Sequence, residues 1–164
     1  MKRKILIIDD NQSLLDSLME LLERQGYLPE PANDLSVASN LYRRNRPDLI
    51  LLDYDVRGRD GLELLDDLRA EPPPTSPFIV MTARDDRTIR VRCLQLGAAG
   101  LLAKPFRMEE LVAEVQRILM MRYLLAGDGG LAPLRLLAHH FPKLLGPHHL
   151  PPKPTRPRDS EDDE

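Results

Sequence analysis

Five charged or hydroxyl-bearing residues stand where continuous apolar runs end: Asp9, Asp10, Asp53, Thr82 and Lys104. Continuous apolar runs are typical of strands that are covered on both faces, as in a parallel sheet. Parallel strands place their carboxyl ends along one edge, where open α/β sheets have their reactive crevice. We therefore expect these five side chains to meet in one crevice.

Three carboxylates in one crevice favour the binding of a cation. Two like charges about 4 Å apart repel by roughly 4 kcal/mol at an effective dielectric constant of 20. Hard oxygen ligands with room for water suit Mg²⁺ or Mn²⁺ rather than Zn²⁺. The sequence therefore predicts a Mg²⁺ or Mn²⁺ site at Asp9, Asp10 and Asp53.

The same set could carry out phosphoryl transfer. An aspartate beside a metal ion can attack a phosphoryl group and form an aspartyl phosphate. Such transfer depends mainly on positioning and on neutralisation of charge. The metal ion, the Lys104 ammonium and the Thr82 hydroxyl would provide both to Asp53.

The elements that must position these residues follow from the hydrophobic pattern. Apolar runs predict strands at 5–8, 27–32, 49–53, 78–82 and 100–104, and they alternate with helical patterns at 11–25, 34–45, 61–70, 85–96 and 108–125. This alternation predicts an α/β fold, a doubly wound five-stranded parallel sheet flanked by five helices, as in flavodoxin-like proteins. The segment 27–32 carries Pro29 and Pro31 and suits only a sheet edge, which agrees with the strand order 2-1-3-4-5.

Composition narrows the classes of protein. The formal net charge is −3, which gives no global reason to expect nucleic acid as a partner. Cys93 is the single cysteine and fits a reducing compartment. No apolar run reaches the roughly 18 residues of a membrane-spanning helix. We therefore expect a cytoplasmic protein without a membrane segment.

At these residues the sequence resembles the receiver domain of two-component response regulators, over residues 1–122. The matching segments are Ile-Ile-Asp-Asp at 7–10, Ile-Leu-Leu-Asp at 50–53, Asp60-Gly61, Met-Thr-Ala at 81–83, Gly97-Ala98 and Lys104-Pro105. The resemblance implies that Asp53 is the phosphoacceptor and that Thr82 and Lys104 hold phosphoryl oxygens. It also implies a Mg²⁺ (or Mn²⁺) ion on Asp10, Asp53 and the Asp55 backbone carbonyl, with Asp9 completing the acidic pair. The Lys104–Pro105 bond is expected to be cis.

The resemblance further implies a signalling function without enzymatic activity. Asp53 would receive its phosphoryl group from a histidine kinase or histidine phosphotransfer protein, and the signal would pass through protein–protein contacts. We expect residues 123–164 to hold the end of the last helix and a Pro-rich, partly disordered tail, with apolar spacing for a short helix near 131–145. We expect this tail to be too short for a DNA-binding output domain.

Three positions bear on how such a receiver would work. Arg57 stands four residues after the acceptor, where the family usually carries proline. Leu101 replaces the family's usual aromatic residue, which turns inward in the active state, so switching at the face formed by segments 85–96, 100–104 and 108–125 would differ. We also hypothesise that Arg84 pairs with Asp55 or with the phosphoryl group and slows hydrolysis.

Two other functions agree with parts of the pattern. The first is a pseudo-receiver that keeps the fold and binds its partner whether or not it is phosphorylated. The second is an aspartyl-phosphate phosphohydrolase, a class that needs a second acid two residues after the nucleophile, as Asp55 follows Asp53. In that class, however, the nucleophile ends the first strand, whereas Asp53 ends the third predicted strand.

Overall fold

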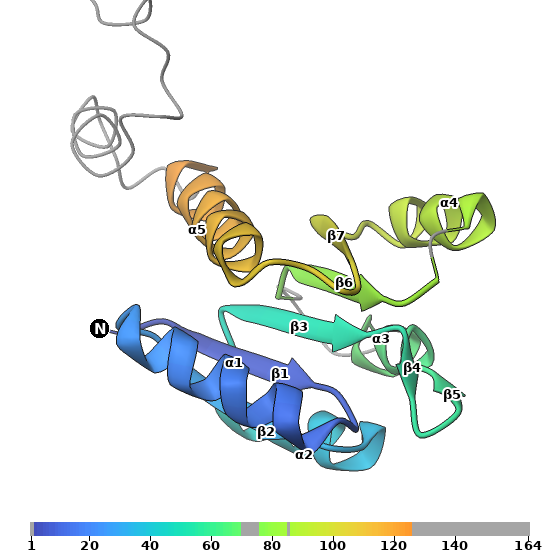
Figure 1. The fold of residues 1–164 in the computed structure, drawn as a ribbon, viewed down its shortest axis with the longest axis horizontal. Helices are drawn as coiled ribbons and strands as arrows, with labels where there is room; N and C mark the ends of the chain where they lie inside the picture. The colour runs from blue at the N-terminus through green and yellow to red at the C-terminus, as the bar shows by residue number, and fades with distance from the viewer. Residues whose placement is uncertain (1, 70–75, 85, 126–164) are drawn as a thin grey trace, which may run out of the picture. The chain divides into compact units, whose positions relative to one another are not determined.

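The computed structural model describes residues 2–69, 76–84 and 86–125 (Figure 1). The chain divides into two compact units, residues 1–122 and 123–164. The predicted Pro-rich tail, with its short helix near 131–145, lies outside the described residues and stays a prediction. Among the described helices, none combines the length and the hydropathy of a membrane-spanning segment.

A five-stranded parallel sheet forms the centre of the first unit (Figure 1). Its strands are β1 (Lys4–Ile8), β2 (Leu28–Ala32), β3 (Leu49–Asp53), β6 (Phe78–Thr82) and β7 (Gly100–Ala103). They lie in the order β2-β1-β3-β6-β7, which confirms the predicted topology. The proline-containing β2 is an edge strand, as expected from its missing backbone donors.

Five helices flank the sheet: α1 (Gln12–Arg24), α2 (Leu35–Asn45), α3 (Glu63–Arg69), α4 (Arg87–Gln95) and α5 (Met108–Leu125). Three of them begin where a side chain accepts a hydrogen bond from a free backbone N–H. These caps are Asn11 for α1, Asp34 for α2 and Asp86 for α4. The helices therefore begin within two residues of the predicted starts.

The continuous apolar runs are buried on both faces of the sheet, as predicted. On one face, Ile5, Ile7, Leu49 and Leu51 pack in a cluster with α1 and α5. On the other face, the alternate strand residues pack with α2, α3 and α4 in a second cluster. Every residue from Ile5 to Ile8 is fully buried. The parallel pairing of β1 and β3 places their carboxyl ends at one edge of this covered sheet.

The sequence did not predict a small hairpin that follows β3. Strands β4 (Asp55–Val56) and β5 (Arg59–Asp60) pair in an antiparallel arrangement. The two residues between them have positive φ, 55° at Arg57 and 74° at Gly58. Two positive φ values in a two-residue loop are typical of a type I′ turn. The hairpin brings Arg57 beside the end of β1.

Candidate functional site

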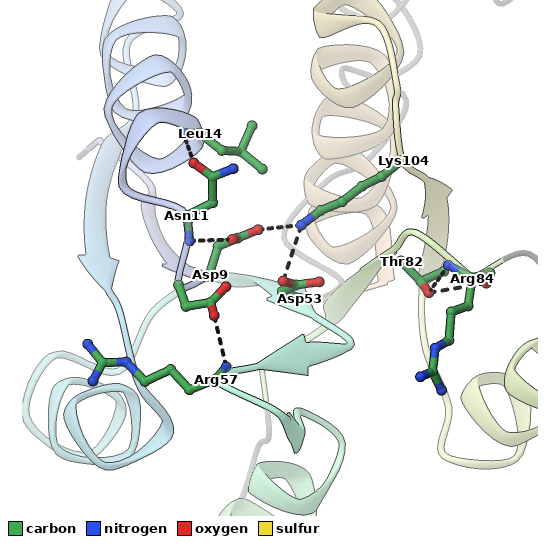
Figure 2. A network of polar contacts seen from close by, with 9 residues as sticks. Asp9, Asn11, Leu14, Asp53, Arg57, Thr82, Arg84 and Lys104 are labelled. Carbon is green, nitrogen blue, oxygen red and sulfur yellow. Dashed lines mark hydrogen bonds and ion pairs between the residues drawn. The ribbon is translucent and has the colours of Figure 1, made fainter.

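Asp9 and Asp10, which directly follow β1, have different hydrogen-bond partners (Figure 2). Asp9 is fully buried. Its Oδ1 accepts a hydrogen bond from the Asn11 N–H at 2.9 Å, and its Oδ2 accepts one from Lys104 Nζ at 2.6 Å. Asp10 is exposed, and its Oδ2 accepts a hydrogen bond from the Arg57 N–H at 3.0 Å. Asp9 is therefore a fixed internal acid, while Asp10 lies at the mouth of the site.

Lys104 joins the ends of β1 and β3. Its Nζ lies 3.2 Å from Asp53 Oδ2 as well as 2.6 Å from Asp9 Oδ2 (Figure 2). Its backbone N–H donates to the Thr82 carbonyl at 2.7 Å, directly after β7. The Lys104–Pro105 bond that follows is cis, as predicted.

The three acids form a group that fits a divalent cation. One carboxylate oxygen from each of Asp9, Asp10 and Asp53 lies within 4.8 Å of the others. An all-oxygen donor set of this kind suits Mg²⁺ or Mn²⁺. The Asp55 side chain is exposed, and its backbone makes a hydrogen bond to Asp53.

Burial and neighbouring charges change the acidity of the site. Burial, followed by the negative charge of Asp9, raises the pKa of Asp53 to about 6, although Lys104 opposes the change. Burial alone would lower the pKa of Lys104, but the hydrogen bond to Asp9 and the charge of Asp53 outweigh it and raise that pKa. At neutral pH, Asp53 is therefore mainly ionised and Lys104 is protonated.

Close to the acceptor, Gly61 is required for steric reasons. A Cβ at this position would lie 2.1 Å from the Asp53 backbone oxygen. The Gly61 N–H donates to the Tyr54 carbonyl at 2.7 Å. Only glycine lets the chain after the hairpin approach the end of β3 so closely.

The Thr82 hydroxyl bonds to a near neighbour in the chain rather than to the acids and the ammonium of the site. It donates to the Arg84 carbonyl at 3.1 Å and accepts from the Arg84 N–H at 3.0 Å. Figure 2 shows this pair turned away from Asp53. The Thr82 side chain thus forms a local turn with the Arg84 backbone. The position of Thr82 at the end of a strand does not predict this turn.

Two further positions that the sequence singled out, Arg84 and Leu101, lie beyond this group of acids. The Arg84 side chain is exposed and extends away from Asp53 (Figure 2). Among the described residues, no ion pair joins Arg84 to Asp55. Leu101 is half-buried and packs against the apolar cluster under α4.

Sequence reasoning missed the role of Arg57 at this site. From the sequence, position 57 stood out only because proline is absent there. In the structure, the Arg57 backbone N–H donates a hydrogen bond to Asp10. Gly58 was the one local signal of a turn here, and Arg57-Gly58 is not among the dipeptides that mark a hairpin turn.

Comparison with known proteins agrees with this geometry. The sequence profile of the response regulator receiver domain matches residues 5–116. Response regulator MprA of Mycobacterium leprae is 40% identical over 116 residues, which cover 71% of this chain and 50% of that protein. The phosphate regulon transcriptional regulatory protein PhoB of Escherichia coli is 34% identical over 120 residues, covering 73% and 52%. The chain thus spans about half the length of these curated relatives.

Solved structures show the same fold. The non-phosphorylated HemR receiver domain of Leptospira biflexa aligns with a TM-score of 0.67 and 34% identity, over 72% of this chain and 94% of that one. The family match, the sheet order and the acidic strand ends lead to one conclusion. The chain belongs to the response regulator receiver domain family of two-component systems.

Proposed function

We propose that this receiver accepts a phosphoryl group on Asp53, in the cytoplasm, from a histidine kinase or histidine phosphotransfer protein. The observation that carries the proposal is the contact of Lys104 Nζ with both Asp9 and Asp53, 2.6 and 3.2 Å away. It places a fixed positive charge beside the candidate nucleophile. Such a charge can stabilise the oxygens of an incoming phosphoryl group.

We propose Mg²⁺ or Mn²⁺ as the cofactor. The Asp10 and Asp53 carboxylates and the Asp55 backbone carbonyl would hold the ion, and the buried Asp9 would add negative charge behind them. The spacing of the three carboxylates supports this assignment. The bound ion would supply charge neutralisation for the phosphoryl group.

The transfer itself would involve one bond formed and one bond broken. An Asp53 carboxylate oxygen would attack the phosphorus atom of a phosphohistidine, and the P–N bond would break. The electron pair would remain on the imidazole nitrogen of the donor. Lys104 would hold one phosphoryl oxygen, and the Thr82 hydroxyl would hold another after it leaves the Arg84 backbone.

We infer protein partners for the output of this domain. The net charge of −3 gives no global reason to expect nucleic acid as a partner. The pseudo-receiver alternative rests on Leu101, which offers no aromatic side chain for switching. The phosphohydrolase alternative is weaker because Asp53 ends the third strand of the sheet and the Asp55 side chain is exposed.

Intact-mass measurement tests the proposal. The full chain is incubated with Mg²⁺ and acetyl phosphate, beside Asp53→Asn and the surface control Asp67→Asn. We expect wild type and Asp67→Asn to gain the mass of one phosphoryl group, and Asp53→Asn to gain none. Unchanged mass in all three would favour the pseudo-receiver. Turnover of phosphomonoesters would favour the phosphohydrolase.

A further inference from the structure

The turn of the β4–β5 hairpin holds the exposed acid of the site. The backbone N–H of Arg57 donates to Asp10 Oδ2 at 3.0 Å. Among the described residues, this is the hydrogen bond that the Asp10 carboxylate accepts, whereas the Asp9 carboxylate accepts two. The conformation of Asp10 therefore depends on where the hairpin places one amide.

The conformation of Arg57 is costly for a residue with a side chain. Its φ of 55° lies in the left-handed region, which favours glycine. Proline can neither adopt this conformation nor donate this hydrogen bond, because its ring fixes φ near −65° and it has no N–H. The Arg57 side chain offsets the cost, since its Nε donates to the Asn33 carbonyl at 3.0 Å. Figure 2 shows the guanidinium directed away from Asp53.

The hairpin is fixed at its other end as well. The Asp60 carboxylate forms an ion pair with Arg92 of α4, and its Oδ1 accepts from the Leu62 N–H at 2.9 Å. Between these anchors and the Asn33 contact, the Arg57 amide is held in place. An ionised carboxylate has about four acceptor sites. One fixed donor can therefore orient the carboxylate and leave acceptor sites free for a cation.

We propose that Arg57 is a positioning residue that orients the Asp10 carboxylate for the divalent cation through its backbone N–H. This inference rests on the proposed metal site. Outer hydrogen-bond partners of metal ligands restrict ligand orientation and thereby raise metal affinity. Arginine serves here through its main chain, and its side chain secures the turn that aims the amide.

Three variants of the full chain separate the donor from the side chain. Arg57→Pro removes the N–H, Arg57→Gly keeps the N–H and accepts positive φ, and Arg59→Gly is a control on the neighbouring exposed arginine. Mg²⁺ affinity is measured by calorimetric titration. We expect Arg57→Pro to weaken affinity by about tenfold or more, in line with lost outer partners of metal ligands. Arg57→Gly and Arg59→Gly should stay within about threefold of wild type, because the amide donor remains and glycine adopts positive φ without a supporting side chain.

Hydrogen exchange of the Arg57 amide provides a second readout that needs no proline. In wild type without metal, we expect this amide to be protected, and Asp10→Ala should remove the protection while Asp67→Asn keeps it. Should Arg57→Pro fail to fold by circular dichroism, this measurement decides. An unprotected amide in wild type would overturn the inference.

The two proposals fail in different ways. If wild type binds no Mg²⁺, the proposed metal site is wrong and the inference falls with it. If wild type binds Mg²⁺ and a folded Arg57→Pro binds it equally well, the positioning role alone is wrong. Weakened binding in Arg57→Pro with retained binding in Arg57→Gly supports both.

Discussion

Lys104 lies closer to the buried Asp9 than to Asp53: its Nζ is 2.6 Å from Asp9 Oδ2 and 3.2 Å from Asp53 Oδ2. The ammonium therefore compensates an acid that has no access to water, and it is shared with the candidate phosphoacceptor. The site thus brings three carboxyl groups together around one ammonium. This excess of carboxyl groups over cations favours the binding of a divalent cation.

Replacing Lys104 should destabilise the fold in the absence of metal. Lys104→Met leaves the fully buried Asp9 without its cation, and removing one partner of a buried pair typically costs 3–5 kcal/mol. Because Lys104 is 21% exposed, we expect about 3 kcal/mol, near the lower end of that range. Urea unfolding at pH 7 measures it, with Lys2→Met as the surface control. A loss below about 1 kcal/mol would show that the pair of Lys104 with Asp9 contributes no more than an exposed ion pair.

The raised pKa of Asp53 predicts a pH dependence of stability with a definite sign. The pKa of Asp53 is about 6 in the folded chain against an ordinary value of 3.8, so the folded state binds this proton more tightly. The metal-free protein should therefore gain stability as pH falls from 7.5 to 5, by about 1 kcal/mol from this group. The comparison is with Asp53→Asn under the same conditions. Equal pH slopes for the two proteins would contradict the assigned pKa.

The strand ends were predictable from sequence because they depend on a strong local signal. The run at 49–53 is buried throughout as β3, and the carboxylate at its end lies where parallel topology requires. The hairpin was not predictable by the same means, since its strands are two residues long and depend on the contacts of Arg57 with Asp10 and Asn33. The sequence predicted the strand of Thr82 correctly, but a local turn with Arg84 determines the orientation of the Thr82 hydroxyl.

Gly61 should tolerate no side chain. In Gly61→Ala, an ideally placed Cβ would lie 2.1 Å from the Asp53 backbone oxygen. The backbone at Asp53 would therefore have to move. Overpacking of this kind typically costs 1–3 kcal/mol, and we expect about 2 kcal/mol together with slower phosphorylation by acetyl phosphate.

Gly26→Ala is the matched control for this prediction. Gly26 has a φ of 86°, and a Cβ added there would meet no atom of the described residues within 4 Å, so alanine adds backbone strain without touching the site. We expect a loss of about 1 kcal/mol and unchanged phosphorylation. If both variants phosphorylate at the wild-type rate, the close approach of Gly61 has no role in placing Asp53.

The ion pair of Asp60 with Arg92 should couple the hairpin to α4. Arg92 is partly exposed, and Asp60 also accepts a hydrogen bond from the Leu62 N–H. The stability lost in a single variant therefore includes more than the ion pair. A double-mutant cycle with Asp60→Asn and Arg92→Gln isolates the interaction, because the amide of asparagine keeps an acceptor for Leu62. We expect a coupling free energy of about 1 kcal/mol, the upper end for partly exposed pairs, and a smaller value at high salt. Additive single effects in urea unfolding would show that α4 and the hairpin are energetically independent despite their contact.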